Sequence, residues 1–168
     1  LEERLETSKR QKFNRPHSAI TFLRKSSGEW IEQSLPGGSP QVIWLDFQGK
    51  QRAEQIEQFQ SLVANVGRPS ILRLTLDVSP ETLGGNNEPK DKIQRLRSQL
   101  GPLLPDDVSP NDFIKGGRGF EDIMREAVTR AAKQALKNQP SMRFQPLLVI
   151  AYKDTNRMLT ITGLVIQR

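Results

Sequence analysis

The feature that most constrains the fold is the middle of the chain, where an apolar segment, an amphipathic segment and a second apolar segment follow one another. Residues 41–47 form a nearly continuous apolar run that contains one carboxylate, which is typical of a parallel strand buried on both faces. In residues 52–66 the apolar side chains recur at intervals of three and four, the spacing of an amphipathic helix. Residues 70–78 again favour a strand. This order predicts one right-handed crossover unit with two parallel strands.

Shorter patterns before and after this unit extend the predicted order of elements. Residues 18–24 are β-prone and predict a short strand, and residues 29–35 predict one or two helical turns. Residues 79–119 are interrupted throughout by Gly and Pro, so we interpret them as an irregular insertion. One short basic helix is expected inside it, near residues 90–100.

The last third of the chain predicts a helix and a hairpin. Residues 120–138 carry apolar side chains on one face and basic ones on or near the other, which we interpret as a solvated face. Residues 145–153 and 158–167 are β-prone and flank a short polar connection, which predicts an antiparallel hairpin. The predicted fold class is therefore α/β, with a mostly parallel sheet that ends in an antiparallel hairpin.

The composition excludes several kinds of active site. The chain has no Cys and a single His, His17, which excludes disulfides, thiolate zinc sites, Cys nucleophiles and sites with several His ligands. Asp106, Asp107 and Asp112 lack the spaced partners of a metal site. The longest apolar run, residues 147–152, is too short to span a bilayer. With no signal peptide in the sequence, we expect a cytoplasmic protein that does not enter a membrane.

Size and charge are compatible with one small domain that is mildly attracted to phosphate. A length of 168 residues predicts about one domain. The net charge is +6, and the excess is spread along the chain rather than gathered in a block. This distribution allows binding to nucleic acid but does not by itself predict it. Residues 116–119 (GGRG) are a weak match to a phosphate loop, because they follow no predicted strand and lack the Lys and Ser or Thr of a P-loop.

Candidate ligand-binding residues follow the predicted strands, because ligands bind at the carboxyl edge of an open parallel sheet. Asp46 closes the most apolar strand and can accept hydrogen bonds from a ligand, while Gly49 lets the backbone come close. The alternative is that Asp46 caps the following helix or binds loop amides. Residues 24–28 follow the first strand, and Asp77 lies near the end of the third, where a turn or a helix cap is the stronger expectation. His17 could be a base, a polar contact or simply structural.

Five segments together resemble a bacterial group of O-methyltransferase-like proteins, and the resemblance spans nearly the whole chain. They are residues 10–16 (RQKFNRP), 42–49 (VIWLDFQG), 70–75 (SILRLT), 152–154 (YKD) and 158–160 (MLT). This group is similar to the class I methyltransferases, which have a Rossmann-like sheet ending in a hairpin and use S-adenosylmethionine.

The resemblance implies S-adenosylmethionine as the cofactor and a set of residues that bind it at the strand ends, namely Arg24, Lys25, Ser26, Asp46, Phe47 and Gly49. The first three would lie near the adenine, and the last three would line the edge where the methyl group is transferred. O-methylation also needs a base near the acceptor, a catalytic role for Asp46 or His17. The acceptor itself is not indicated.

The first part of the chain departs from the family pattern. Such enzymes open with a strand and a Gly-rich loop that holds the cofactor, and then a second strand ending in an acid; this sequence has neither. Residues 18–24, 41–47 and 70–78 would be the third, fourth and fifth strands, and the missing two belong between the third and the fourth. We therefore expect residues 1–168 to be one incomplete Rossmann-like domain, completed by an earlier segment or a partner chain. Direct pairing of residues 18–24 with residues 41–47 would contradict this assignment.

Two other functions stay open. A non-catalytic subunit could keep the same fold for binding or assembly, possibly on nucleic acid, which the missing cofactor loop and the basic charge favour. A metal nuclease that uses Asp46 and Asp77 is a third possibility, although the sequence lacks the Glu-x-Lys pattern expected on a strand.

Overall fold

The computed structural model describes residues 17, 19, 21, 23–35, 38–47, 49–84, 88–113, 119–153 and 155–168. The chain divides into two compact units, Leu1–Leu35 and Pro36–Arg168.

The N-terminal unit contains one described helix, α2 (Ser27–Gln33). Ser26 precedes it as the N-cap: its hydroxyl accepts a hydrogen bond from the backbone N–H of Glu29, and the Glu29 carboxylate accepts one from the backbone N–H of Ser26. This capping box fixes the start of the helix and confirms the predicted helical turns. The predicted strand over residues 18–24 is wrong where the structure describes it. Residues 19, 21, 23 and 24 lie in no strand, whereas residues 18, 20 and 22 lie outside the described residues. Among its described residues, the N-terminal unit has no strand with which this segment could pair its backbone groups.

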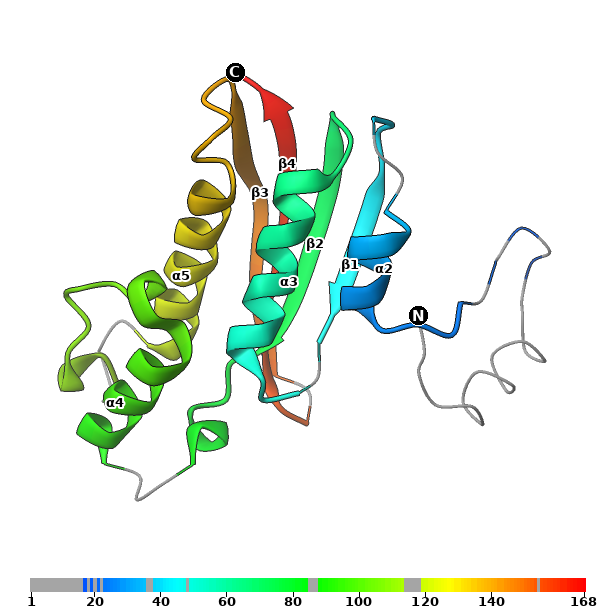
Figure 1. Ribbon diagram of the computed structural model, residues 1–168. Coiled ribbons are helices and arrows are strands. Elements are labelled where there is room, and N and C mark those ends of the chain that lie inside the picture. The colour runs from blue at the N-terminus through cyan, green and yellow to red at the C-terminus, as the bar shows by residue number, and fades with distance from the viewer. Residues whose placement is uncertain are drawn as a thin grey trace. The chain divides into compact units, whose positions relative to one another are not determined.

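The C-terminal unit alternates strands and helices in the predicted order (Figure 1). Its strands are β1 (Val42–Asp46), β2 (Ser70–Asp77), β3 (Met142–Lys153) and β4 (Arg157–Gln167). Its helices are α3 (Arg52–Asn65), α4 (Pro89–Leu100) and α5 (Phe120–Ala135). Short 3₁₀ turns at Pro80–Leu83, Gly101–Leu103 and Pro110–Phe113 account for part of the insertion, which is therefore less irregular than predicted.

The four strands form one sheet in the order β1-β2-β4-β3. β1 and β2 are parallel, with Val42 opposite Ile71 and Asp46 opposite Thr75, as the crossover unit predicted. β4 runs antiparallel to both β2 and β3, so the predicted hairpin is confirmed and its second strand is the one next to β2. The protein is thus a mixed α/β structure whose sheet is partly parallel and partly antiparallel. Among the described residues β1 pairs with β2 alone.

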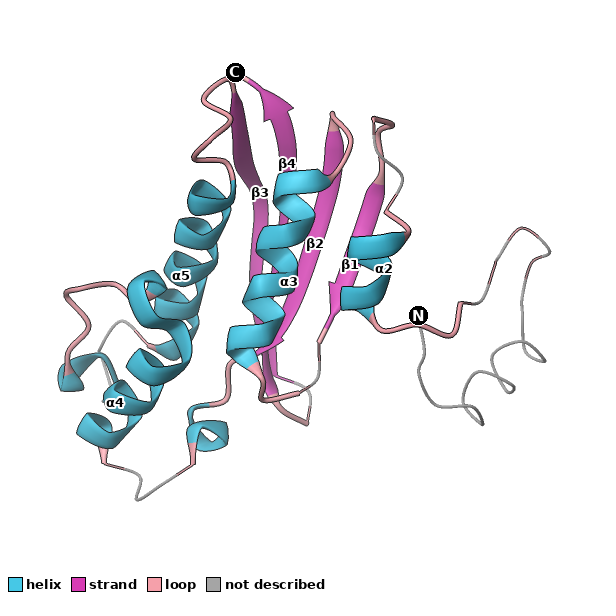
Figure 2. Cartoon of the chain, in the orientation of Figure 1, coloured by secondary structure: helices cyan, strands magenta, loops and turns pink. Residues whose placement is uncertain are grey.

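Helices α3 and α5 cover one face of the sheet, as Figure 2 shows. The ring of Phe59 on α3 meets the ring of Phe144 on β3 edge to face, with 5.6 Å between the ring centroids. The core between helices and sheet consists of apolar side chains at most 3% exposed, among them Ile56, Phe59, Leu62, Leu72, Leu74, Leu76, Ile123, Ala127, Ala131, Leu159, Ile161 and Val165. Those from the helices follow the spacing of three and four that predicted them.

Both edge strands expose large apolar side chains. In β1, Leu45 is buried, but Val42 is 78% exposed and Trp44 is 55% exposed. The prediction that this strand is buried on both faces is therefore wrong. Alternate side chains of a strand point to opposite faces, and Val42 and Trp44 belong to the face away from the core. At the other edge, β3 exposes Leu147, Leu148, Val149, Ile150 and Tyr152.

Candidate functional site

The carboxyl ends of the parallel strands β1 and β2 are adjacent, and the loops that follow them form the candidate site. Asp46 is the last residue of β1, and its side chain is exposed. The carboxylate has no hydrogen-bond or ion-pair partner among the described residues. The interpretation of Asp46 as a helix cap is wrong, because Gln51 occupies the N-cap position of α3 and makes no side-chain cap. The Asp46 carboxylate is thus available to a ligand.

Phe47 and Gly49 continue from Asp46 toward α3. The backbone N–H of Phe47 donates to the carbonyl of Thr75 at 3.0 Å, so the pairing with β2 extends one residue beyond the strand. The carbonyl of Gly49 accepts a hydrogen bond from Nε2 of Gln55 at 3.0 Å. A Cβ at position 49 would meet Oε1 of Gln51 at 2.4 Å, but this is the end of a flexible side chain that can move away. Close approach of a ligand to Gly49 stays a prediction.

Asp77 lies at the end of β2 and is almost completely buried. Its Oδ1 accepts a hydrogen bond from the backbone N–H of Ser79 at 2.7 Å, and its Oδ2 accepts one from Nδ2 of Asn156 at 2.9 Å. Nη2 of Arg52 lies 3.8 Å from Oδ1. These contacts bear out the interpretation of Asp77 as a turn residue, and they leave it no surface for a ligand or a metal ion.

Arg52, the first residue of α3, is also almost completely buried. Its Nε donates to the carbonyl of Asp77 at 3.2 Å, and its Nη2 donates to Oγ1 of Thr82. The guanidinium carbon lies 5.2 Å from the centre of the Phe120 ring, within the range of a cation–π contact. Burial lowers the pKa of Arg52, and the nearby Asp77 carboxylate opposes that shift.

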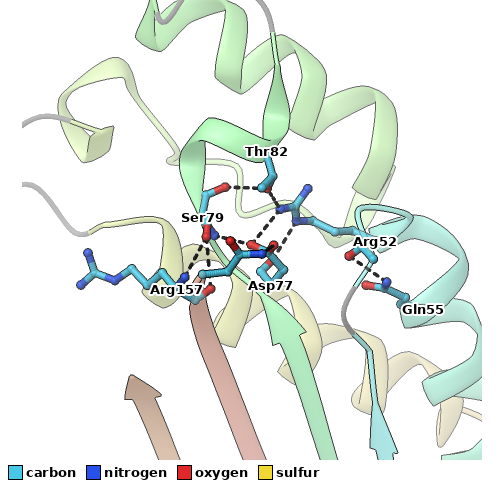
Figure 3. A network of polar contacts seen from close by, with 8 residues as sticks. Arg52, Gln55, Asp77, Ser79, Thr82 and Arg157 are labelled. Atoms are coloured by element: carbon cyan, nitrogen blue, oxygen red, sulfur yellow. Dashed lines mark hydrogen bonds and ion pairs between the residues drawn. The ribbon is translucent and has the colours of Figure 1, made fainter. Parts of the chain in front are cut away.

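The tip of the β3–β4 hairpin joins the same cluster (Figure 3). The backbone N–H of Arg157 donates to Oγ of Ser79 at 2.8 Å, and the backbone N–H of Val78 donates to the carbonyl of Arg157 at 2.8 Å. Nη2 of Arg157 pairs with Oε1 of Glu121, in the first turn of α5, at 2.5 Å. Arg52, Asp77, Ser79, Thr82 and Asn156 are called the Arg52–Asp77 network below. It ties together three segments that are far apart in the sequence.

The other predicted site residues belong to the N-terminal unit. Ser26 caps α2, and Nζ of Lys25 donates to Oγ of Ser34 at 2.8 Å. Arg24 is exposed. Nδ1 of His17 accepts a hydrogen bond from the backbone N–H of Ala19 at 3.1 Å. A common site for these residues and Asp46 stays a prediction.

The remaining charged candidates show no ligand site within the described ranges. Oδ2 of Asp106 lies 3.6 Å from Nη1 of Arg130, and Asp112 accepts a hydrogen bond from the backbone N–H of Ser109. On α5, Arg125 pairs with Asp122 and Arg130 with Glu126, which supports the interpretation as a solvated face. The described residues contain no group of three acids or histidines that could hold a metal ion. The loop over 116–118 lies outside them.

Comparison with known proteins decides the family. A family model described as "Putative O-methyltransferase" matches residues 1–168. The chain belongs to this O-methyltransferase family. No curated protein matches the sequence. The family resemblance carried by the five short segments is thereby confirmed.

In this O-methyltransferase family member, the structure brings together one part of the predicted site. Asp46, Phe47 and Gly49 lie along the same loop at the carboxyl edge of β1. Gln48 lies outside the described residues.

No helix that the structure describes is long and apolar enough to cross a membrane.

Sequence reasoning missed Arg52. A signal was present, because Arg52, Ile56, Phe59 and Val63 follow one another at intervals of four, three and four, so the Arg occupies the apolar face of α3. A charged residue in such a position is either at the surface or paired with an acid inside. The acid at the end of the next strand, Asp77, was the natural candidate for its partner.

Proposed function

We propose that the chain forms the methyl-transfer side of an S-adenosylmethionine-dependent O-methyltransferase, with Asp46 at its centre. The observation that carries the proposal is the exposed Asp46 carboxylate, without a partner among the described residues, at the carboxyl end of β1 in a member of this family. Parallel strands bind their ligands at this end, because the loops that follow the strands converge there. The acceptor is a hydroxyl compound whose identity is left open.

The described residues suit one side of S-adenosylmethionine. Asp46 offers a carboxylate that accepts hydrogen bonds, and the half-buried Phe47 beside it offers apolar surface. When bound, the cofactor supplies an electrophilic methyl group. Arg24, Lys25 and Ser26 would meet the adenine, as the family resemblance implies. Ser26 would contact the adenine in addition to capping α2.

Asp46 is the better of the two candidate bases. Its carboxylate is free to take the proton that an acceptor hydroxyl loses when its oxygen is methylated. His17 uses Nδ1 to accept the N–H of Ala19, so a neutral ring carries its proton on Nε2 and has no further lone pair to offer. Methyl transfer is an in-line displacement, so most of the acceleration comes from holding the acceptor in line.

We further propose that β1 is an inner strand of a larger, Rossmann-like sheet in the working protein. One edge of β1 lacks a partner strand among the described residues, and Val42 and Trp44 are exposed on the outer face of the same strand. An open edge with apolar side chains is costly and prone to aggregate. A segment of the same polypeptide or a partner chain that adds strands here would also bring the loop that holds the rest of the cofactor.

Calorimetric titration of the intact protein with S-adenosylmethionine tests the proposal. We expect binding, and we expect Asp46→Ala to weaken it about tenfold or more, since a hydrogen bond to a charged group contributes about 1.5–3 kcal/mol. Asp106→Ala is the matched control, because it removes an exposed acid elsewhere and should leave the affinity unchanged. An intact, folded protein that binds no S-adenosylmethionine would refute the proposal and favour a non-catalytic binding subunit.

A further inference from the structure

Three loops meet at the carboxyl edge: Arg52 adjoins the first, contacts the second and is linked to the third through Asp77. The loop after β1 ends at Arg52 itself, and Gln55, one turn further along α3, holds the carbonyl of Gly49. The loop after β2 is held by the bonds from Arg52 to Asp77 and Thr82. The hairpin tip is held through Asp77 and Asn156. The cluster is thus continuous from the loop that follows Asp46 to the tip of the hairpin.

Stability alone does not account for a buried Arg at this position. Desolvation is the larger influence on Arg52, as the direction of its pKa shift shows. Its Nη1 is buried without a hydrogen-bond partner among the described residues, and so is Oε1 of Gln55. Apolar side chains of similar volume in place of both Arg52 and Asp77 would fill this space without burying a charge. What the planar guanidinium provides is simultaneous contact with both ends of the loop after β2, at Asp77 and Thr82, and with the Phe120 ring at the start of α5, which neither an apolar residue nor Lys reproduces.

We propose that Arg52 is a positioning residue, which with Asp77 and Gln55 holds the loop after Asp46 in the arrangement that binds ligand. The identity of the ligand in this inference rests on the proposed function. The coupling between the loops is independent of that function. Arg52 itself is buried and touches no substrate. It borders the loop between Asp46 and α3 as the first residue of α3, while Gln55 on the same helix holds that loop at the carbonyl of Gly49. Through Asp77 and Thr82 it acts on the loop and hairpin beside it.

The test compares Arg52→Lys with Arg68→Lys in the intact protein. Arg68 is a matched control at the far end of α3, where it is half-buried and its Nη2 donates to the carbonyl of Ala64 at 3.1 Å and to Oε1 of Gln139 at 2.7 Å. Lys at position 52 keeps the charge opposite Asp77, so this variant should fold. A second variant, Gln55→Leu, removes the link to Gly49 and leaves Arg52 in place.

Two readouts are measured. The first is the calorimetric Kd for S-adenosylmethionine, which Arg52→Lys and Gln55→Leu should each raise about tenfold or more, because misplaced contacts at a binding site are costly. The second is the hydrogen-exchange rate of backbone amides. Arg52→Lys should speed exchange in residues 49–51, 78–82 and 155–157 together, whereas Gln55→Leu should speed it in residues 49–51 alone. Arg68→Lys should change neither readout at this edge.

The outcomes separate the two proposals. If the wild type binds S-adenosylmethionine and Arg52→Lys binds it equally well, Arg52 is not a positioning residue and the proposed function stands. If the wild type does not bind, the proposed function fails, and joint acceleration of exchange in the three loops still supports the positioning role. If exchange changes only in residues 78–82, the loops are not coupled and the inference is overturned.

Discussion

Arg52 and Asp77 are each about 1% exposed, and the cost of burying either charge is offset only while the other is present. Asp77→Asn keeps the shape of the side chain and removes its charge, which leaves the guanidinium of Arg52 buried without a counter-charge. We expect the free energy of unfolding to fall by about 3–5 kcal/mol, measured by urea denaturation. Asp106→Asn, at an acid whose side chain is 98% exposed, should leave the unfolding midpoint unchanged. A variant Asp77→Asn as stable as the wild type would show that the pair contributes no electrostatic stabilisation.

Single residues also show where sequence reasoning about the site stops. Asp46 could be predicted, since a carboxylate that closes an apolar strand marks the ligand-binding edge of a parallel sheet. Arg52 was missed because its surroundings come from Asp77, Thr82 and Phe120, which lie 25 or more positions away along the chain. Local periodicity marks the Arg as unusual, but only packing shows which groups surround it.

At the scale of elements, the β3–β4 hairpin contains a close contact that can be tested. A Cβ added to Gly163 on β4 would lie 2.3 Å from Cζ of Phe144 and 2.9 Å from the carbonyl of Gln145. Gly163→Ala should therefore lower the free energy of unfolding by about 1–3 kcal/mol, as overpacking does. Phe144→Leu should cost less in the Gly163→Ala background than in the wild type, because the ring no longer has to be accommodated. Strictly additive losses in thermal denaturation would show that the two residues do not compete for space.

The same elements show which parts of the fold the spacing of apolar residues can predict. The crossover unit and the hairpin could be predicted, because amphipathic spacing and a short polar turn are local properties of residues 52–66 and 154–157. Residues 41–47 were interpreted as buried on both faces, yet Val42 and Trp44 are exposed. An apolar run predicts that both faces of a strand are buried, but it does not indicate which part of the protein buries them. The strand predicted at residues 18–24 is wrong at its described residues for a related reason, since a strand forms only with a partner.

At the scale of the whole molecule, Trp44 reports whether the outer face of β1 is covered in the intact protein, as both faces of a Rossmann-like sheet are. It can be observed alone in a Trp30→Phe variant, since the chain has two Trp. Acrylamide is the suitable quencher because it is neutral, whereas iodide would be attracted by the Arg73 guanidinium, whose carbon lies 4.4 Å from the centre of the Trp44 ring. We expect Trp44 fluorescence in the intact protein to be quenched much less than that of a free indole. Quenching close to that of free indole would argue that the outer face of β1 stays uncovered.

Methyl transfer at the carboxyl end of β1 is the central claim. A crystal structure of the intact protein with S-adenosylhomocysteine, the product of the reaction, tests this claim most directly. We predict that the sulfur of the product lies beside Asp46 and Phe47, with the loop of residues 47–51 against the ligand. Product bound at the amino ends of the strands, or a well-ordered complex in which Asp46 faces only solvent, would contradict it.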